Sequence, residues 1–142
     1  MPLINFGSIL NFAEELEQGD YDFYSTLIQN SECIRDKEIY DKFSTDAKKN
    51  VKTVQRTRRE NVTEMILEPI VDFTRASYVI KYGNAETMDA AEALETASRL
   101  EERAKRYYTE ASKKIKALPE VARILKLLAK KRQAHLGMID SR

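Results

Sequence analysis

Hydrophobic residues recur along this chain at the three- and four-residue spacing of an amphipathic helix, in four separate stretches. The first stretch predicts a helix from Gly7 or Ser8 to near Gln29, with Ser8 as its N-cap. Asn30-Ser31 supplies the break after it. The apolar positions that define this helix are Ile9, Phe12, Ala13, Leu16, Phe23 and Leu27.

The second stretch predicts a helix that begins near Asp36 and continues towards Leu67. Pro69 cannot continue a helix without losing a hydrogen bond, so the helix ends or kinks just before it. The segment 70–82 is apolar enough to pack on a bundle, and Gly83-Asn84 ends it. This segment predicts a long connection between two helix pairs.

The last two stretches predict a second helix pair, over residues 86–116 and 120–139. Leu118-Pro119 separates these helices, and Pro119 followed by Glu120 is typical of a helix start, where negative charge suits the positive end of the helix dipole. Val121, Ile124, Leu125, Leu128, His135 and Leu136 form the apolar face of the last helix.

The two halves of the chain repeat a pattern that includes acidic residues. Ala13, Glu17, Phe23 and Tyr24 correspond to Ala97, Glu101, Tyr107 and Tyr108, at an offset of 101 − 17 = 84 residues. Repetition of a whole helix pair predicts an all-α four-helix bundle built from two related hairpins.

Composition agrees with a single helical domain. The chain has 142 residues, of which 33% are charged and only 4 are Gly and 3 Pro, which favours long helices over a sheet. We expect one domain over residues 1–142, with a first helix pair at 1–69, a crossover at 70–84 and a second pair at 85–142. No apolar run approaches the ~18 residues of a membrane span, and the N-terminus does not have the features of a signal peptide. The single Cys33 favours a reducing, cytoplasmic location.

Charge is unevenly spread although the net charge is only +1. No Lys or Arg precedes Arg35, and the residues from Arg103 to Arg132 are rich in both. One interpretation is that an acidic first helix lies beside basic later helices or beside a partner subunit. A nucleic-acid surface along Lys48 to Arg59 is the alternative, and the near-neutral net charge disfavours it.

The chain resembles the rubrerythrin branch of the ferritin-like superfamily. The residues that carry the resemblance are Glu17 with Phe23-Tyr24, Glu101 with Tyr107-Tyr108, and Leu128-Ala129 followed by His135. The resemblance implies a ferritin-like four-helix bundle whose two hairpins are joined by a long crossover. It also implies a di-iron carboxylate site, with isolated glutamates on the odd helices and a Glu-x-x-His pair on each even helix.

Only part of the ligand set that the resemblance implies is present. Glu17, Glu101 and His135 match family ligands, whereas Asn50, Thr53 and Arg132 stand where the family has Glu, His and Glu. The positions Asn50, Thr53 and Arg132 are therefore vestigial. A rebuilt metal site would use Glu17, Asp20, Glu101 and His135.

Arg132 is the sharpest departure, because a guanidinium is cationic, donates hydrogen bonds and accepts none. We expect it to replace the charge of the metal by pairing with Glu17 and Glu101. For Asp20, three alternatives stay open: a pair with Arg132, a ligand of a rebuilt metal site, or an outward position without a role.

His135 and the tyrosines have two interpretations. His135 is either a remaining metal ligand or a buried side chain bonded to Glu101 or to a tyrosine, and the second is favoured. Tyr21, Tyr24, Tyr107 and Tyr108 either lie near a metal or pack in the core with their hydroxyls bonded to carboxylates, and again we favour the second.

The residues favour a structural or interaction protein without catalysis and without a cofactor. It would act as a homodimer and with an unidentified protein partner, and neither a nucleic acid nor a membrane is expected. The alternative is a rubrerythrin-like, iron-dependent oxidoreductase that acts on peroxide or oxygen.

Overall fold

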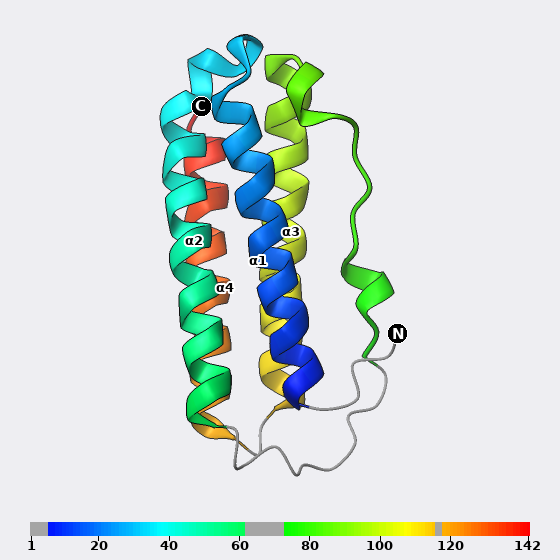
Figure 1. The fold of residues 1–142 in the computed structure, drawn as a ribbon, viewed down its shortest axis with the longest axis vertical. Coiled ribbons are helices and arrows are strands. Elements are labelled where there is room, and N and C mark those ends of the chain that lie inside the picture. The colour runs from blue at the N-terminus through cyan, green and yellow to red at the C-terminus, as the bar shows by residue number, and fades with distance from the viewer. Residues whose placement is uncertain (1–5, 62–72, 116–117) are drawn as a thin grey trace.

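The structure is a computed structural model that describes residues 6–61, 73–115 and 118–142. Four long helices lie side by side (Figure 1): α1 at Phe6–Ile28, α2 at Lys37–Glu60, α3 at Ala90–Lys114 and α4 at Pro119–Asp140. The most extensive packing joins α1 to α2 and α3 to α4. The predicted all-α bundle of two helix hairpins is confirmed.

The crossover follows the outside of the bundle and returns the chain to the end where α3 begins (Figure 1). Its described part contains a short 3-10 helix, η3, at Arg75–Tyr78. Phe73 and Tyr78 are buried, and their ring centroids lie 5.6 and 5.0 Å from that of Tyr107 on α3. The expected packing on the bundle is confirmed for the described part of this segment, through Phe73 and Tyr78; Pro69 and residues 70–72 lie outside the described residues.

In the first hairpin, two expected helix boundaries are wrong. The first helix begins at Phe6, so Ser8 lies inside it rather than at its N-cap. The second helix ends at Glu60 rather than near Leu67, which lies outside the described residues. At that end, the side-chain amide of Asn61 donates a hydrogen bond to the carbonyl oxygen of Thr57, which satisfies one of the last carbonyls of the helix.

Between α1 and α2, the expected break at Asn30-Ser31 is present and is followed by a 3-10 helix, η1, at Ser31–Asp36. Asn30 accepts a hydrogen bond from the backbone of Glu32 and donates to the carbonyl oxygens of Ala85 and Met88, both at 2.9 Å. One asparagine therefore ends the first hairpin and ties it to the start of the second.

The third helix begins at Ala90, whereas the apolar pattern predicts a start at Glu86. A 3-10 helix, η4, occupies Ala85–Thr87 and is capped by the side chain of Asn84. The side chain of Asp89 then caps α3 by accepting a hydrogen bond from the backbone of Glu92 at 2.8 Å. Two successive caps split what the apolar pattern predicts as one helix.

The apolar core is divided into two clusters by a band of buried polar residues. One cluster includes Ile9, Leu16, Val54, Tyr107 and Leu125, and the other includes Phe23, Leu27, Phe43, Leu100 and Ile139. The polar residues that lie between them along the helices are each no more than 3% exposed: Glu17, Asp20, Asn50, Glu101, Arg132 and His135. Isolated charges are rarely buried so completely, so this band is the natural candidate for a functional site.

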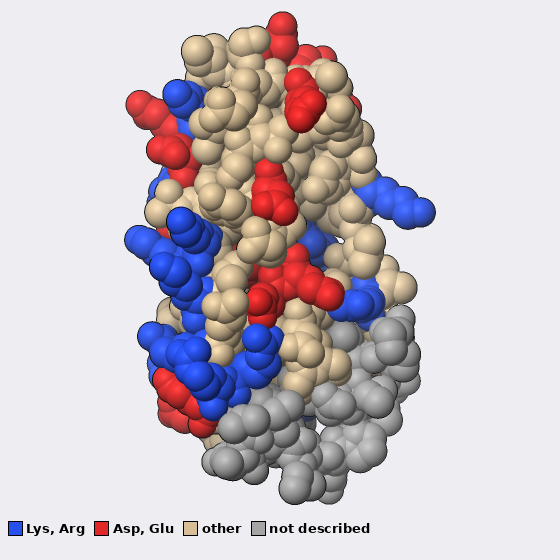
Figure 2. All heavy atoms as spheres, in the orientation of Figure 1, with Lys and Arg blue, Asp and Glu red and all other residues tan. Residues whose placement is uncertain are grey.

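On the face shown in Figure 2, acidic side chains gather over α1 and basic side chains gather over α2, among uncharged residues. Arg58 of α2 pairs with Glu14 at 2.8 Å, and Arg75 of the crossover pairs with Glu15. These contacts confirm that the acidic first helix lies beside basic segments that follow it in the chain. Within the ranges that the structure describes, we find no helix with the length and apolar character that a membrane crossing requires.

Candidate functional site

The guanidinium of Arg132 occupies the centre of the polar band and contacts three carboxylates. Its Nη1 donates to Oε2 of Glu101 at 2.7 Å. Its Nη2 lies 2.9 Å from Oε1 of Glu17 and 2.9 Å from Oδ2 of Asp20. Both Nη2 contacts are ion pairs, and they are not aligned as hydrogen bonds. The predicted pairing of Arg132 with Glu17 and Glu101 is confirmed.

Glu101 of α3 contacts three side chains of the site. Besides Arg132, it accepts a hydrogen bond from the hydroxyl of Tyr24 at 2.5 Å. Its Oε1 lies 2.8 Å from Nδ1 of His135. The expected bond between His135 and Glu101 is confirmed.

His135 also connects the site to the surface between α2 and α4. Its Nε2 lies 2.8 Å from Oδ2 of Asp46, which pairs with Lys42 at 3.0 Å. Its ring is stacked on Phe43 with centroids 4.0 Å apart. Since both ring nitrogens face carboxylates, only the doubly protonated imidazole can donate to both.

Glu17 of α1 is contacted by side chains from three other helices. The hydroxyl of Tyr108 on α3 donates to Oε2, and the amide of Asn50 on α2 donates to Oε1 at 3.1 Å. Arg132 on α4 supplies the third contact. The expectation that tyrosine hydroxyls are satisfied by carboxylates is confirmed for Tyr24 and Tyr108. It is wrong for Tyr107, whose hydroxyl donates to the backbone oxygen of Ile9 at 2.7 Å.

Asp20 is buried between two arginines. Its Oδ1 accepts a hydrogen bond from Nη2 of Arg103 on α3 at 2.6 Å, and its Oδ2 faces Arg132. Of the three alternatives for Asp20, the outward position is wrong and the pair with Arg132 is confirmed. Asp20 thereby joins the surface-proximal Arg103 to the buried guanidinium.

The environment sets the charge of each group. Burial lowers the pKa of Arg132, but the carboxylates of Glu101, Glu17 and Asp20 outweigh it and hold that pKa well above its usual value. Burial also raises the pKa values of Tyr24 and Tyr108, and the neighbouring carboxylates raise them further. The arginine is therefore a permanent cation, and both phenols remain neutral donors.

The two buried glutamates respond in opposite directions. For Glu101, burial raises the pKa, but Arg132, His135 and Tyr24 together outweigh burial and lower it. For Glu17, burial dominates and the nearby Asp20 carboxylate adds to it, so the pKa is raised despite Arg132. The same cation thus stabilises the ionised form of Glu101 more completely than that of Glu17.

Of the seven positions that the sequence singles out, six meet in this band and Thr53 does not. Thr53 is half-buried on α2, and its hydroxyl donates to the backbone oxygen of Lys49 at 3.2 Å. On α2, the residue that reaches His135 is Asp46, one turn before Asn50. The four helices therefore converge as the resemblance implies, but α2 contacts His135 through Asp46 and not through Thr53.

Sequence reasoning missed two members of the site, Asp46 and Arg103. A signal for Asp46 is its spacing of four residues from Asn50, which places both on one helix face. Arg103 lies within a run of charged residues on α3, and nothing in that run distinguishes the buried arginine from its exposed neighbours. The sequence singles out its partner Asp20. Whether Arg103 reaches Asp20, however, depends on how α1 and α3 are rotated about their axes.

The arrangement does not fit the di-iron group that the resemblance implies. The carboxylate oxygens that would face a cation, Oε2 of Glu101, Oε1 of Glu17 and Oδ2 of Asp20, already face the guanidinium. A permanent positive charge at this centre repels a metal ion. Across the described ranges, no group of three or more His, Cys, Asp or Glu side chains is arranged to hold a metal.

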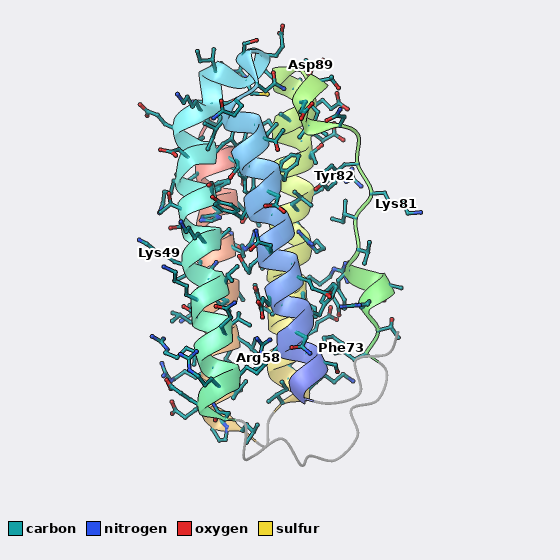
Figure 3. The ribbon with its side chains drawn as sticks, viewed as in Figure 1. Lys49, Arg58, Phe73, Lys81, Tyr82 and Asp89 are labelled. Carbon is teal, nitrogen blue, oxygen red and sulfur yellow. The ribbon has the colours of Figure 1, made fainter. Side chains whose placement is uncertain are left out.

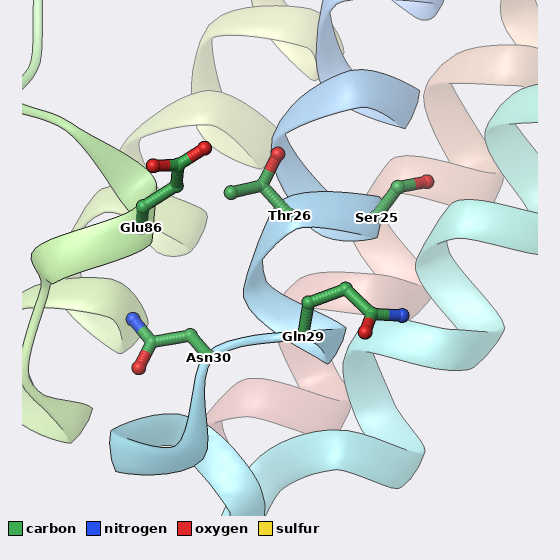
Figure 4. Close-up of a pocket in the computed structure, with 5 residues that line it drawn as sticks. All are labelled: Ser25, Thr26, Gln29, Asn30 and Glu86. Carbon is green, nitrogen blue, oxygen red and sulfur yellow. The ribbon is translucent and has the colours of Figure 1, made fainter.

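A recess of about 450 Å³ lies at the end of the first hairpin and is distinct from this site (Figure 4). Ser25, Thr26, Gln29, Asn30 and Glu86 line it. Asn30 holds the backbone of the second hairpin, and the hydroxyl of Thr26 donates to the carbonyl oxygen of Asp22. These bonds serve the local structure, so the recess is not a candidate active site.

Comparison with known proteins identifies one related family. The model of the rubrerythrin family matches residues 92–141, which cover most of α3 and α4. This segment contains Glu101, Tyr107-Tyr108, Leu128-Ala129 and His135, the residues that carry the resemblance in the second half of the chain. No curated protein and no solved structure matches the chain.

Proposed function

We propose that this chain is a ferritin-like bundle, related to the rubrerythrin family that its residues 92–141 match, in which an arginine has replaced the metal centre. It acts as a non-catalytic structural or interaction protein. The observation that carries the proposal is the position of Arg132, with side-chain nitrogens 2.7 to 2.9 Å from carboxylates on α1 and α3. A ligand position that is filled by a cation has lost the chemistry of a ligand.

Charge balance supports the proposal. Three buried carboxylates, those of Glu17, Asp20 and Glu101, require positive charge, which a metal centre supplies in the family that the chain resembles. Here Arg132 and Arg103 supply two positive charges from within the chain, and burial raises the pKa of Glu17, which favours its neutral form. The bundle therefore needs no metal to compensate its buried acids.

Iron-dependent turnover of peroxide or oxygen is the competing function. One observation favours it: Glu17, Asp20, Glu101 and His135 do converge on one region of the core. Those four side chains would be the ligands, and they would become available only if the guanidinium of Arg132 moved out of the centre. That movement would separate three ion pairs inside the protein, which is costly.

Iron retention separates the two functions. Purified protein is loaded anaerobically with Fe(II), desalted and measured for metal by mass spectrometry, and peroxide consumption is followed in parallel. The proposal predicts no retained iron and no turnover above that of the buffer, with full helicity. Near-stoichiometric iron in the wild type that is lost in Glu17→Ala, together with peroxide turnover, would establish the oxidoreductase instead.

A further inference from the structure

We infer that the face formed by α1 and α2 binds a second copy of this chain, so that α1 of each copy lies against α2 of the other. Figure 2 shows acidic side chains over α1 beside basic side chains over α2, on one face of the molecule. The inference rests on the proposed role as an interaction protein and names the surface and the partner.

The basic half of this face is a stripe of Lys48, Lys52 and Arg59 on α2, all three exposed. Spacings of four and seven residues place them on one side of the helix. Gln55, which lies on the same side, donates to Glu14 of α1 at 2.8 Å, so this basic stripe borders α1. None of its three residues forms an ion pair with another described residue, whereas Lys49 belongs to a neighbouring face and points away from the bundle (Figure 3).

The acidic half is a stripe of Glu15, Gln18 and Asp22 on α1. These residues line a shallow groove of about 650 Å³ together with Asn11, Glu14 and Arg58. Asp22 accepts a hydrogen bond from Gln18 at 3.1 Å and has no cationic partner among the described residues. Glu15 already pairs with Arg75 of the crossover, so Asp22 supplies the negative charge of the acidic stripe that no described residue neutralises.

The two stripes lie at the same height along the bundle. Contacts between α1 and α2 join Asn11 to Arg58, Glu14 to Gln55, Glu17 to Asn50 and Ser25 to Ser44. This antiparallel register places Lys48 about level with Asp22, and Lys52 about level with Glu15, within roughly one helical turn.

Two stripes of opposite charge at equal height make the face complementary to itself. A two-fold axis that runs parallel to the helices, between α1 and α2, places each acidic stripe on the basic stripe of the other copy. Helices of 23 and 24 residues present a face of about 35 by 20 Å, or roughly 700 Å², which is close to the ~800 Å² per partner of a specific complex. Because the face is polar, we expect a weak dimer that high salt dissociates.

A nucleic acid fits this face less well than a second copy does. An extended polyanion that follows the basic stripe would also meet Glu15 and Asp22 beside it, and like charges repel. A partner that carries both charges in the opposite order avoids that repulsion.

Charge reversal tests the inference through the oligomeric state, measured by sedimentation at a series of protein and salt concentrations. We expect the wild type to dimerise at low salt, and Lys48→Glu and Asp22→Lys each to weaken dimerisation at least tenfold. An equimolar mixture of the two variants should dimerise again, because each altered residue then meets its opposite charge. Lys126→Glu, an exposed reversal on α4, is the matched control and should dimerise as the wild type does.

Three outcomes would overturn the inference. The first is a wild type that stays monomeric at low salt. The second is a dimer whose affinity neither charge reversal changes, and the third is a mixture of the two variants that does not dimerise. Binding of duplex DNA that Lys48→Glu abolishes, with no dimer at any salt concentration, would reassign the basic stripe to nucleic acid. Iron retention by the same samples is measured separately. Loss of the dimer then reports on the interface alone, and retained iron reports on the proposed non-catalytic role.

Discussion

Arg132 and Glu101 face each other across the interface between α4 and α3, with Nη1 2.7 Å from Oε2 and both side chains almost completely buried. A buried pair of this kind contributes little net stability compared with an apolar pair, but removal of one partner is severe. Each residue of the pair therefore matters mainly because it compensates the buried charge of the other.

Replacement of the two buried glutamates should shift stability with pH in opposite directions. The pKa of Glu101 is lowered in the fold, so its stabilising contribution is present above about 4.5 and is lost as pH falls through the folded pKa. The pKa of Glu17 is raised, so its favourable contribution is present below about 4.5 and is lost as pH rises through the folded pKa.

Urea unfolding from pH 4 to pH 8 checks this. Glu101→Gln should cost about 3 kcal/mol at pH 7, and the deficit should shrink towards pH 4. Glu17→Gln should change stability by only about 1 kcal/mol at pH 7, and its stability relative to the wild type should improve as pH rises. Parallel pH profiles for the two variants would show that both glutamates have the same environment.

Tyr24 and Tyr108 should each stabilise the fold through their hydroxyl groups. Each donates to a buried carboxylate, so Tyr24→Phe and Tyr108→Phe should each cost about 1.5–3 kcal/mol, without loss of helicity. Tyr82→Phe is the control, because Tyr82 is 42% exposed and lies on the crossover (Figure 3). Thermal unfolding followed by circular dichroism measures all three, and equal losses would contradict a specific role for the buried hydroxyls.

Asp20 and Arg103 should be energetically coupled. A double-mutant cycle with Asp20→Asn and Arg103→Met should give a coupling energy of about 1–3 kcal/mol, because the pair is buried and Nη2 lies 2.6 Å from Oδ1. The exposed pair Arg106–Glu110 on α3, at 3.7 Å, is the reference and should give about 0.5 kcal/mol or less. Equal couplings for the two pairs would mean that burial does not strengthen the Asp20–Arg103 contact.

Much of the fold and of the site could be predicted because both depend on helical periodicity. The spacing of Glu17, Glu101, Arg132 and His135 within their helices places them at one depth of a four-helix bundle, and that position is confirmed. The orientation of Asp20 could not be decided, since it depends on a few tens of degrees of helix phase. Its burial is secured by Arg103, a partner 83 residues away in sequence.

The errors at helix ends have a local cause. The apolar pattern continues through residues 85–89. The side chains of Asn84 and Asp89, however, accept hydrogen bonds from nearby backbone N–H groups, and α3 begins only at Ala90. Such caps compete with helical hydrogen bonds on nearly equal terms, so a pattern of apolar residues does not decide between them. Asp46 was missed for a different reason, because Thr53 matches the family pattern by position although Asp46 is the residue that contacts His135.

We propose that Arg132, and not a metal, compensates the buried carboxylates. The most direct test is the free energy of unfolding of chelator-treated protein, measured in urea for the wild type and for Arg132→Met, with Arg123→Met as an exposed control on the same helix. We predict a cooperatively folded, metal-free wild type, a loss of about 3–5 kcal/mol in Arg132→Met, and less than about 1 kcal/mol in the control. A wild type that unfolds on chelation and recovers with Fe(II), or an Arg132→Met variant as stable as the control, would contradict the claim.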